Sequence, residues 1–257
     1  MSGLSDAGLL MRRSVVRLLR QPANIVFAFV FPLLLLAVNA GGLNAATRIA
    51  GFPSNTYVTF ALAVPFVQGA LFASNIAGTN VAQDIESGFL SRLALTPITR
   101  TALLAGQLAG VMALGVAQAV VYLAVGEAAG AGFKAGPGGI LVLFALAILT
   151  TLAFGAVGAF AAIRTGSGEA VQGLFPLFFV FLFLSSISLP RDLIQTDWFR
   201  TVATYNPVSY LLEGIRSLLI TGWDGQALAL GFACAAGVAA IALTACVIGL
   251  RTRVLRT

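Results

Sequence analysis

The sequence predicts an all-α integral membrane protein with six transmembrane helices and an N-terminal amphipathic interfacial helix. Hydrophobic residues make up 59% of the 257 residues, and charged residues only 9%. A soluble domain carries about 25% charged residues, so this chain could not cover a water-facing surface, whereas apolar helices can face lipid directly. The few charges, almost all of the positive ones arginine, fall between six apolar stretches long enough to cross a bilayer.

Residues 4–20 are predicted to form the amphipathic helix. Apolar residues recur there with the spacing of one helical face, and the arginines occupy another. An arginine-rich side suits a helix that lies along anionic lipid headgroups; a solvated helix leading into the membrane is the alternative. The apolar face holds Leu4, Ala7, Met11, Val15, Leu18 and Leu19, and the polar face holds Asp6, Arg12, Arg13, Arg17 and Arg20.

Six apolar segments follow, each near the ~20 residues that a helix needs to cross the hydrocarbon core. The predicted spans are 24–40, 57–80, 102–125, 139–163, 169–189 and 226–250. No convincing cleavage site follows the first, so we expect a retained span and not a signal peptide. With the N-terminus inside, ten basic residues lie on the cytoplasmic side and five outside. This bias predicts a multi-pass protein of the cell membrane with both termini in the cytoplasm.

The residue types that the sequence lacks exclude several kinds of chemistry. The chain has no histidine, which rules out a His-metal site, a His general base and a Ser-His-Asp triad. Its only lysine, Lys134, follows Phe133, and a Walker A phosphate loop needs glycine directly before its lysine. No predicted span core contains Asp or Glu, which argues against a membrane-embedded enzyme. We therefore expect no metal site and no catalytic residues.

The basic character of the chain points to lipid and not to nucleic acid. The net charge is +6, but the positive residues are distributed between apolar stretches and do not form one patch. The expected anionic partner is therefore the headgroup layer of the membrane. Cys234 and Cys246 fall about 18 Å apart along one predicted helix, so we expect two small packing residues and no disulfide between them.

The segment 81–97, between the second and third spans, is predicted to be a short cytoplasmic helix. Asp84 and Glu86 lie near its start and Arg92 toward its end, which complements a helix dipole. Phe89 and Leu90 are apolar residues beside these charges, and such a helix could be gripped by a partner protein. A plain connecting loop is the alternative.

A second distinctive segment, 205–220, precedes the last span. Asn206 can cap a helix whose first residue is Pro207. Glu213 and Arg216 have the spacing of an i, i+3 ion pair. The segment is apolar enough to dip into the outer leaflet but too short to cross comfortably, and an external amphipathic helix fits equally well.

Together these two segments resemble type-2 ABC transporter permeases, and the daunorubicin-resistance branch looks most similar. The order of the segments, the N-terminal helix, the six spans and the length all fit. The matching residues are Glu86, Gly88, Thr96 and Pro97 in the first segment, Thr99 and Arg100 just after it, and Asn206, Pro207 and Arg216 in the second. The resemblance implies that 81–97 is a coupling helix and that 205–220 forms short re-entrant external helices. The implied coupling residues are Asp84, Glu86, Gly88, Phe89, Leu90 and Arg92.

Polar and aromatic residues inside two spans are the candidate cargo pathway. They recur at three- or four-residue spacing on the second span and lie broadly on one side of the fifth. Amides beside rings suit an amphiphilic or aromatic cargo; helix–helix hydrogen bonds and lipid-facing packing are the alternatives. The stripes consist of Gln68, Phe72, Asn75 and Thr79 on the second span, and Gln172, Phe175, Phe179 and Ser186 on the fifth.

The function implied by the resemblance is that of the transmembrane permease subunit of an ATP-binding cassette exporter for a drug or lipid-like cargo. The implied partners are a separate ATPase subunit, which binds ATP and Mg²⁺, and a second permease copy, identical or similar. This chain would need no cofactor. A polysaccharide- or glycolipid-exporting permease is one alternative, although the chain has only two Trp and four Tyr. An autonomous channel or secondary carrier is the other, although buried charges and broken half-helices are not evident.

Overall fold

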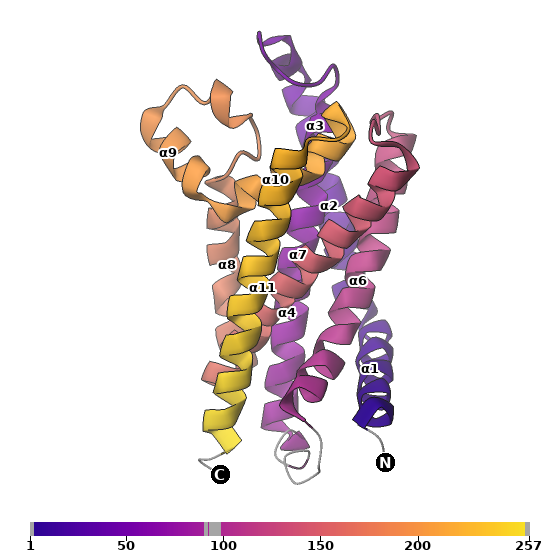
Figure 1. Ribbon diagram of the computed structural model, residues 1–257, viewed down its shortest axis with the longest axis vertical. Helices are drawn as coiled ribbons and strands as arrows, with labels where there is room; N and C mark the ends of the chain where they lie inside the picture. Colours follow the sequence, from indigo (N-terminus) through magenta and orange to yellow (C-terminus); the bar gives the residue numbers. More distant parts are fainter. Residues whose placement is uncertain (1–2, 90–91, 93–98, 255–257) are drawn as a thin grey trace.

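A computed structural model describes residues 3–89, 92 and 99–254, and these residues form a bundle of long helices (Figure 1). Both chain termini lie at one end of the bundle, which we call the terminal end. The opposite, distal end carries the short elements η1, η2, α9, α10 and η3. The elements are α1 (Gly3–Leu19), α2 (Pro22–Leu43), η1 (Asn44–Arg48), α3 (Tyr57–Ala61), α4 (Ala63–Glu86), α6 (Arg100–Ala128), α7 (Gly136–Thr165), α8 (Gly168–Phe183), η2 (Arg191–Leu193), α9 (Asp197–Tyr205), α10 (Pro207–Arg216), η3 (Ser217–Thr221) and α11 (Gly225–Val254).

The all-helical membrane class is confirmed, and the number of full-length spans is corrected. Five helical segments in the described part of the chain are long and apolar enough to cross a membrane: Pro22–Arg48, Tyr57–Glu86, Ala102–Ala128, Gly136–Thr165 and Gly225–Thr252. The predicted span 169–189 is wrong in length, because α8 ends at Phe183 after 16 residues. A helix of that size is about 24 Å long, shorter than a hydrocarbon core of about 30 Å.

α8 ends where it does because a distant side chain occupies its terminal carbonyls. The Asn206 amide donates to the carbonyls of Phe181 and Leu184 at 2.6 and 3.0 Å. The last carbonyls of a helix have no partner inside the helix and must find one elsewhere. With this cap in place, the chain leaves the helix and continues across the distal end to η2.

α4 is the centre of the bundle. In the apolar window of Tyr57–Glu86, 94% of the residues are buried, against 17% for Pro22–Arg48. The backbones of α4 and α7 touch at Gly158: a Cβ added there would lie 1.9 Å from the Ser74 carbonyl oxygen. Small residues allow this approach, which supplies packing between helices in lipid.

A proline anchors α2 to the bundle. Pro32 lies inside α2 and has no N–H, so it cannot donate to the carbonyl of Ala28 four residues earlier. That carbonyl instead accepts hydrogen bonds from the Tyr122 hydroxyl at 2.7 Å and the Gln118 amide at 3.4 Å, both on α6. The kink-prone position thus becomes the attachment point of a helix that is otherwise widely exposed.

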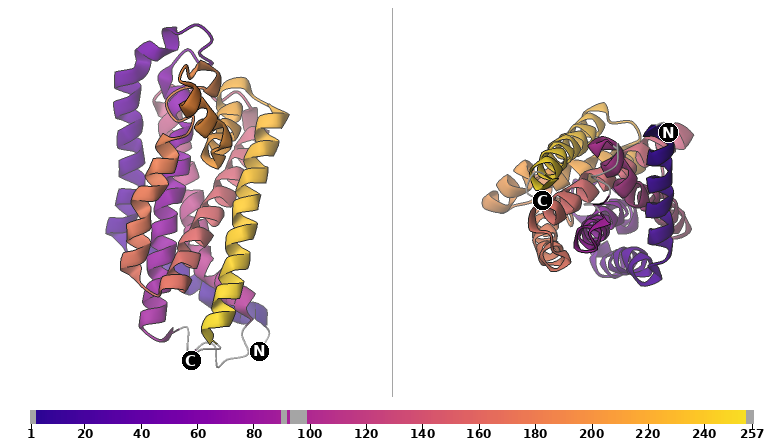
Figure 2. Two further views of the ribbon diagram at one scale, coloured as in Figure 1. Left: turned by 90° about the vertical axis from the view of Figure 1, so that its left-hand side faces the viewer. Right: turned by 90° about the horizontal axis from the view of Figure 1, so that it is seen from below.

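α1 lies obliquely across the terminal end and packs on α6 (Figure 2). Gly110 N–H donates to Ser14 Oγ at 3.0 Å, and a Cβ at Gly106 would meet the Leu10 side chain at 2.4 Å. The helix is confirmed. Its face carrying Leu10 and Ser14 packs on the α6 glycines, whereas Met11 and Leu19 of the predicted apolar face are exposed.

The predicted helix 81–97 is corrected at its start only; Phe89 and Arg92 are helical, and residues 90–91 and 93–97 lie outside the described residues. Residues 81–86 are the last turns of α4, which runs without a break to Glu86. Gly88 follows with φ +67°, a left-handed conformation that glycine adopts without strain, and nothing lies within 4 Å of where its Cβ would be. Gly88 therefore permits a sharp turn, and α6 begins afterwards at Arg100 with Thr99 as its cap.

Candidate functional site

A cavity of about 470 Å³ opens between α2, α4 and α8. α4 contributes most of the wall, α8 faces it, and the first turns of α2 close one side. The lining residues are Asn24, Phe27, Phe72, Asn75, Ile76, Thr79, Gln83, Gln172 and Phe175. Two helices about a hundred residues apart in the chain therefore present their polar and aromatic residues to one space.

Most of the predicted stripe residues meet at this cavity. Phe72, Asn75 and Thr79 of α4 face Gln172 and Phe175 of α8. The remaining predicted residues lie elsewhere. Phe179 is next to the cavity, 6.4 Å from Phe72 between ring centroids. Gln68 is buried and does not line the cavity. Ser186 is buried at the distal end, where its N–H donates to Ser209 Oγ.

α2 supplies a third wall that the sequence reading missed. Phe27 lies 5.3 Å from Phe72 in an edge-on contact, and Phe31 lies 5.7 Å from Phe72 and 6.1 Å from Phe179. Phe72 also lies 5.1 Å from Phe175. Asn24, Phe27 and Phe31 recur at helical spacing, so the same criterion used for α4 and α8 could have found them.

The wall of the cavity is uncharged but rich in hydrogen-bonding groups. Amides of Asn24, Asn75, Gln83 and Gln172 alternate with phenyl rings. Pro176 cannot donate to the Gln172 carbonyl four residues earlier, which adds an acceptor at this level of α8. Such a lining can bind an amphiphile by ring contacts and neutral hydrogen bonds. The described residues contain no group of three His, Cys, Asp or Glu that could hold a metal.

Asp84 lies at the terminal end and joins three helices. Its carboxylate is 2% exposed and accepts from Arg13 at 3.0 and 2.8 Å, from Arg17 at 2.8 Å and from the Gln107 amide at 2.6 Å. The hydrogen bonds to Asp84 raise the pKa of the Arg13 guanidinium above its ordinary value. Asp84 thus ties α1 and α6 to the end of α4 from an inward-facing position.

The other implied coupling residues surround this junction. Glu86 is exposed, and one of its carboxylate oxygens lies 3.5 Å from the N–H of Gly168 at the start of α8. The Phe89 ring lies 3.9 Å from the Arg13 guanidinium, and Arg92 donates to the Ser87 carbonyl at 3.0 Å. Leu90 falls outside the described residues. A docking role for these residues stays a prediction.

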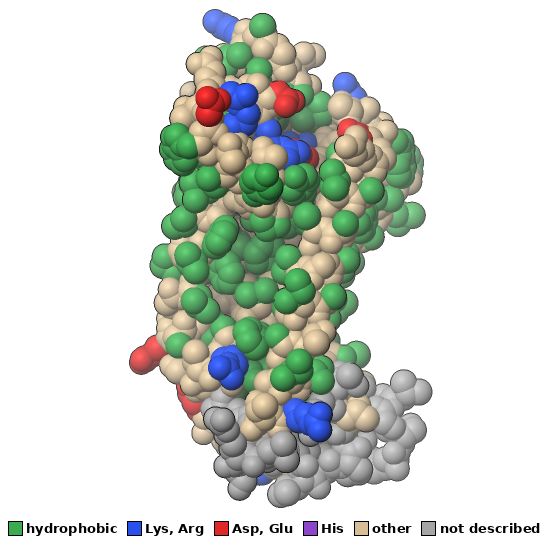
Figure 3. Space-filling model, turned by 60° about the vertical axis from the view of Figure 1, so that its left-hand side comes forward, with side chains coloured by type: hydrophobic (Ala, Val, Ile, Leu, Met, Phe, Trp, Pro, Cys, Tyr) green, Lys and Arg blue, Asp and Glu red, His purple; other side chains and the backbone are tan. Residues whose placement is uncertain are grey.

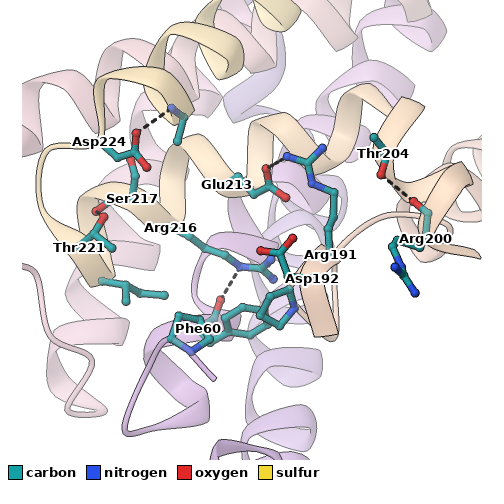
Figure 4. A pocket seen from close by; sticks show the side chains of 14 residues that line it. Phe60, Arg191, Asp192, Arg200, Thr204, Glu213, Arg216, Ser217, Thr221 and Asp224 are labelled. Carbon is teal, nitrogen blue, oxygen red and sulfur yellow. Dashed lines mark hydrogen bonds and ion pairs between the residues drawn. The ribbon is translucent and has the colours of Figure 1, made fainter. Parts of the chain in front are cut away.

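The distal segment confirms one local prediction and corrects another. Asn206 Oδ1 accepts from Val208 N–H at 2.9 Å, so Asn206 caps α10 with Pro207 as its first residue. The predicted Glu213–Arg216 pair is wrong. Glu213 pairs with Arg191, whereas Arg216 donates to the carbonyl of Phe60 (Figure 4). Arg216 also donates to the carbonyls of Ser186 and Ile187. Burial of Arg216 turns its guanidinium toward α3 and away from its own helix.

The bundle combines five segments long and apolar enough to cross a membrane with a cavity that no charged residue lines. The chain belongs to the ABC-2 type transporter family, whose model matches residues 6–220. It is therefore a multi-pass, non-catalytic permease subunit, and permeases of this family generally pair with an ATPase subunit.

Two relatives support the same assignment. The chain is 26% identical over 219 residues to the "Putative transport permease ycf38" of Porphyra purpurea, covering 84% of this chain and 74% of the relative. It is 30% identical over 168 residues to the daunorubicin resistance ABC transporter permease protein DrrB1 of Streptomyces coeruleorubidus, covering 63% of this chain and 58% of that relative.

Proposed function

We propose that this chain forms the pathway of an ATP-driven exporter for an amphiphilic drug or lipid-like cargo. The observation that carries the proposal is the meeting of the α4 and α8 stripes, with α2, around one uncharged cavity of about 470 Å³. Without a Walker A lysine, the chain relies on a separate ATPase subunit that binds ATP and Mg²⁺. The daunorubicin resistance relative favours a drug-like cargo.

The proposed orientation places the terminal end in the cytoplasm and the distal end outside. The basic residues predict this arrangement, and the two termini lie at the same end of the bundle (Figure 1). In this orientation Glu86, Phe89 and Arg92 face the ATPase, and α9 and α10 lie at the outer surface. In an exporter with this orientation, the cargo enters the cavity from the cytoplasmic side and leaves past α10 on the outer side.

A second permease copy would complete the pathway. α2 forms one wall of the cavity, yet most of the central residues of the Pro22–Arg48 span are not buried within the chain. Phe27 lines the cavity and is also exposed, so a partner face placed there would enclose the cargo. The rings of the lining are all phenylalanine, which favours an amphiphile over a polysaccharide, since the latter would use the hydroxyl and indole groups of Tyr and Trp.

Cysteine labelling tests whether the cavity is a pathway. In a chain whose Cys234 and Cys246 are replaced by alanine, Asn75→Cys and Gln172→Cys should react with a water-soluble maleimide. Leu177→Cys, exposed on α8 outside the cavity, should react much more slowly because lipid covers it. Thiolates react only where water reaches them. Equal labelling at all three positions, or none at Asn75 and Gln172 in any nucleotide state, would refute the pathway.

Glu86→Arg tests the coupling surface. We expect normal membrane abundance but an ATPase complex weakened by about 2 kcal/mol or more, because one reversed charge at the centre of a small interface has a large effect. The readout is co-purification of the ATPase. The control is Glu127→Arg, the same change at an exposed acid of the distal end. If the complex with Glu86→Arg is as abundant as that with the control, the end of α4 does not dock the ATPase.

A further inference from the structure

A second pocket, of about 490 Å³, lies at the distal end and is separate from the proposed pathway cavity (Figure 4). It is formed where the loop before α3, η2, α9, α10, η3 and the start of α11 converge. Its lining residues are Pro53, Phe60, Pro190, Arg191, Asp192, Arg200, Thr204, Glu213, Arg216, Ser217, Ile220, Thr221, Asp224 and Ala227. η3 is a π-helical turn, a feature that is frequent at functional sites.

This pocket concentrates the scarce charges of the chain. Six of its fourteen lining residues are charged, whereas charged residues make up 9% of the sequence. Three are arginines and three are carboxylates, so the lining is neutral overall but strongly polar in its parts. Figure 3 shows acidic and basic side chains gathered at the distal end above a broad apolar belt.

The charges differ in how much of their binding capacity is already used. Arg216 is 5% exposed and donates only to backbone carbonyls among its described partners, so its positive charge stays in the floor of the pocket. Arg191 uses one nitrogen for Glu213, and a guanidinium has five N–H donors. Asp192 is exposed, and no ion pair involves it among the residues that the structure describes.

The aromatic residues indicate that the pocket lies at headgroup depth. Both tryptophans of the chain are at this end and face outward: Trp198 is 63% and Trp223 61% exposed, and Tyr205 is 84% exposed. Trp and Tyr are enriched at the two membrane–water interfaces. Trp223 directly precedes the pocket residue Asp224, and the last candidate span starts at Gly225. The pocket is therefore placed where lipid phosphates and ammonium groups are found.

We propose that this pocket binds a zwitterionic phospho-ammonium headgroup. The phosphate meets the N–H groups that Arg191 and Arg200 have left, since guanidiniums suit phosphate geometry, and the ammonium meets the carboxylate of Asp192. Arg200 already donates Nε to the Ile194 carbonyl at 2.9 Å and Nη2 to Asp197 at 3.1 Å and the Gln195 carbonyl at 3.4 Å, which leaves its Nη1 for the ligand. Phe60, Ile220 and the prolines of the lining contact the glycerol end of the ligand. A purely anionic headgroup is disfavoured because three carboxylates share the lining. The same headgroup occurs in a phospholipid of the bilayer and in a zwitterionic amphiphile that is being exported. The pocket would bind the headgroup in either case.

The test uses the full chain in detergent and two lysophospholipids with the same acyl chain. Trp198 lies on α9, which helps to form the pocket, and Trp223 directly precedes the lining residue Asp224, so their fluorescence reports occupancy. We expect a saturable change with lysophosphatidylethanolamine at about tenfold lower concentration than with lysophosphatidylglycerol, the effect of one charge-assisted hydrogen bond. Asp192→Asn should remove this preference, and Arg200→Gln should weaken both lipids, since both carry phosphate.

Matched controls lie at the same end but outside the pocket. Glu127→Gln and Arg48→Gln each remove one exposed charge and should leave both titrations unchanged. Thermal unfolding checks each variant, and if Arg200→Gln fails to fold, Asp192→Asn decides alone. A non-saturable response, equal affinity for the two lipids, or an unchanged preference in Asp192→Asn would overturn the site.

A second arm separates the two sources of the headgroup. The chain is placed in vesicles with its ATPase partner, a fluorescent phosphatidylethanolamine and ATP. A bilayer lipid that serves the site structurally stays in its leaflet and remains bound during turnover, whereas a transported amphiphile appears in the opposite leaflet. Either result keeps the site. Failure of lipid binding in detergent leaves the pathway proposal intact, because that proposal is tested at Asn75 and Gln172.

Discussion

Gly158→Ala is expected to destabilise the bundle severely, by about 3 kcal/mol or more. The added methyl group would lie 1.9 Å from the carbonyl oxygen of Ser74 and 2.8 Å from its hydroxyl. The first of these atoms belongs to the backbone of α4 and cannot move unless the whole helix shifts. Since α4 is the buried centre of the structure, a shift there would disturb its contacts with α2, α6 and α8 as well.

The measurement is membrane abundance together with the thermal midpoint in detergent. The control is Gly237→Ala in α11, where nothing lies within 4 Å of the added carbon; it should be neutral or slightly stabilising, because alanine favours the helix over glycine. If both substitutions behave alike, the α4–α7 contact is looser than the structure shows.

Asp84→Asn is expected to release α1 from the terminal end. The amide keeps the shape of the carboxylate but loses its charge, so the guanidiniums of Arg13 and Arg17 are left without the anion that they share at the buried position 84. Removing one member of a buried charge cluster costs several kcal/mol, and because both arginines are partly exposed we expect about 2 kcal/mol. Hydrogen exchange should become faster throughout α1 while α7 and α11 keep their protection.

The matched control for this change is Asp197→Asn. Asp197 also pairs with an arginine, Arg200, but its side chain is 95% exposed, and surface pairs contribute little. Its exchange pattern and thermal midpoint should be those of the unaltered chain. Unchanged protection of α1 in Asp84→Asn would show that the helix is held by its packing on Gly106 and Gly110 alone.

The pathway residues could be predicted from sequence because their signal is local. A polar residue inside an apolar span is costly and therefore informative, and the spacing of Phe72, Asn75 and Thr79 fixes one face of a helix. The structure brings that face against Gln172 and Phe175, which are found by the same criterion of polar and aromatic residues on one side of a span. Gln68 fitted the same spacing, but a stripe does not reveal where along its length the neighbouring helix covers it.

The roles of Asp84 and Arg216 could not be predicted because their partners are distant in the chain. Asp84 binds Arg13, 71 residues away, and Arg216 binds the carbonyl of Phe60, 156 residues away. The i, i+3 rule that paired Glu213 with Arg216 is worth only about 0.2–0.5 kcal/mol on a helix surface. Burial of Arg216 requires hydrogen bonds from its guanidinium, and the nearest acceptors in the fold outweighed that local preference.

The length of α8 illustrates the same limit. Leu184, Ile187 and Leu189 follow Phe183 among three serines without a charged residue, so composition alone extends the span to residue 189. The side chain of Asn206 ends the helix earlier by binding the carbonyls of Phe181 and Leu184. That cap is visible only when residues more than twenty positions apart are brought together.

The central claim, that this chain is a transport subunit driven by a separate motor, is tested most directly by one purification. The affinity-tagged chain, extracted gently from its own membrane, should bring down an ATP-binding cassette ATPase, and the complex should hydrolyse ATP. After the ATPase is stripped away, the chain alone should show no hydrolysis, because its only lysine follows phenylalanine and cannot form a phosphate loop. ATP hydrolysis by the isolated chain, or a chain that co-purifies with no ATPase, would contradict the account.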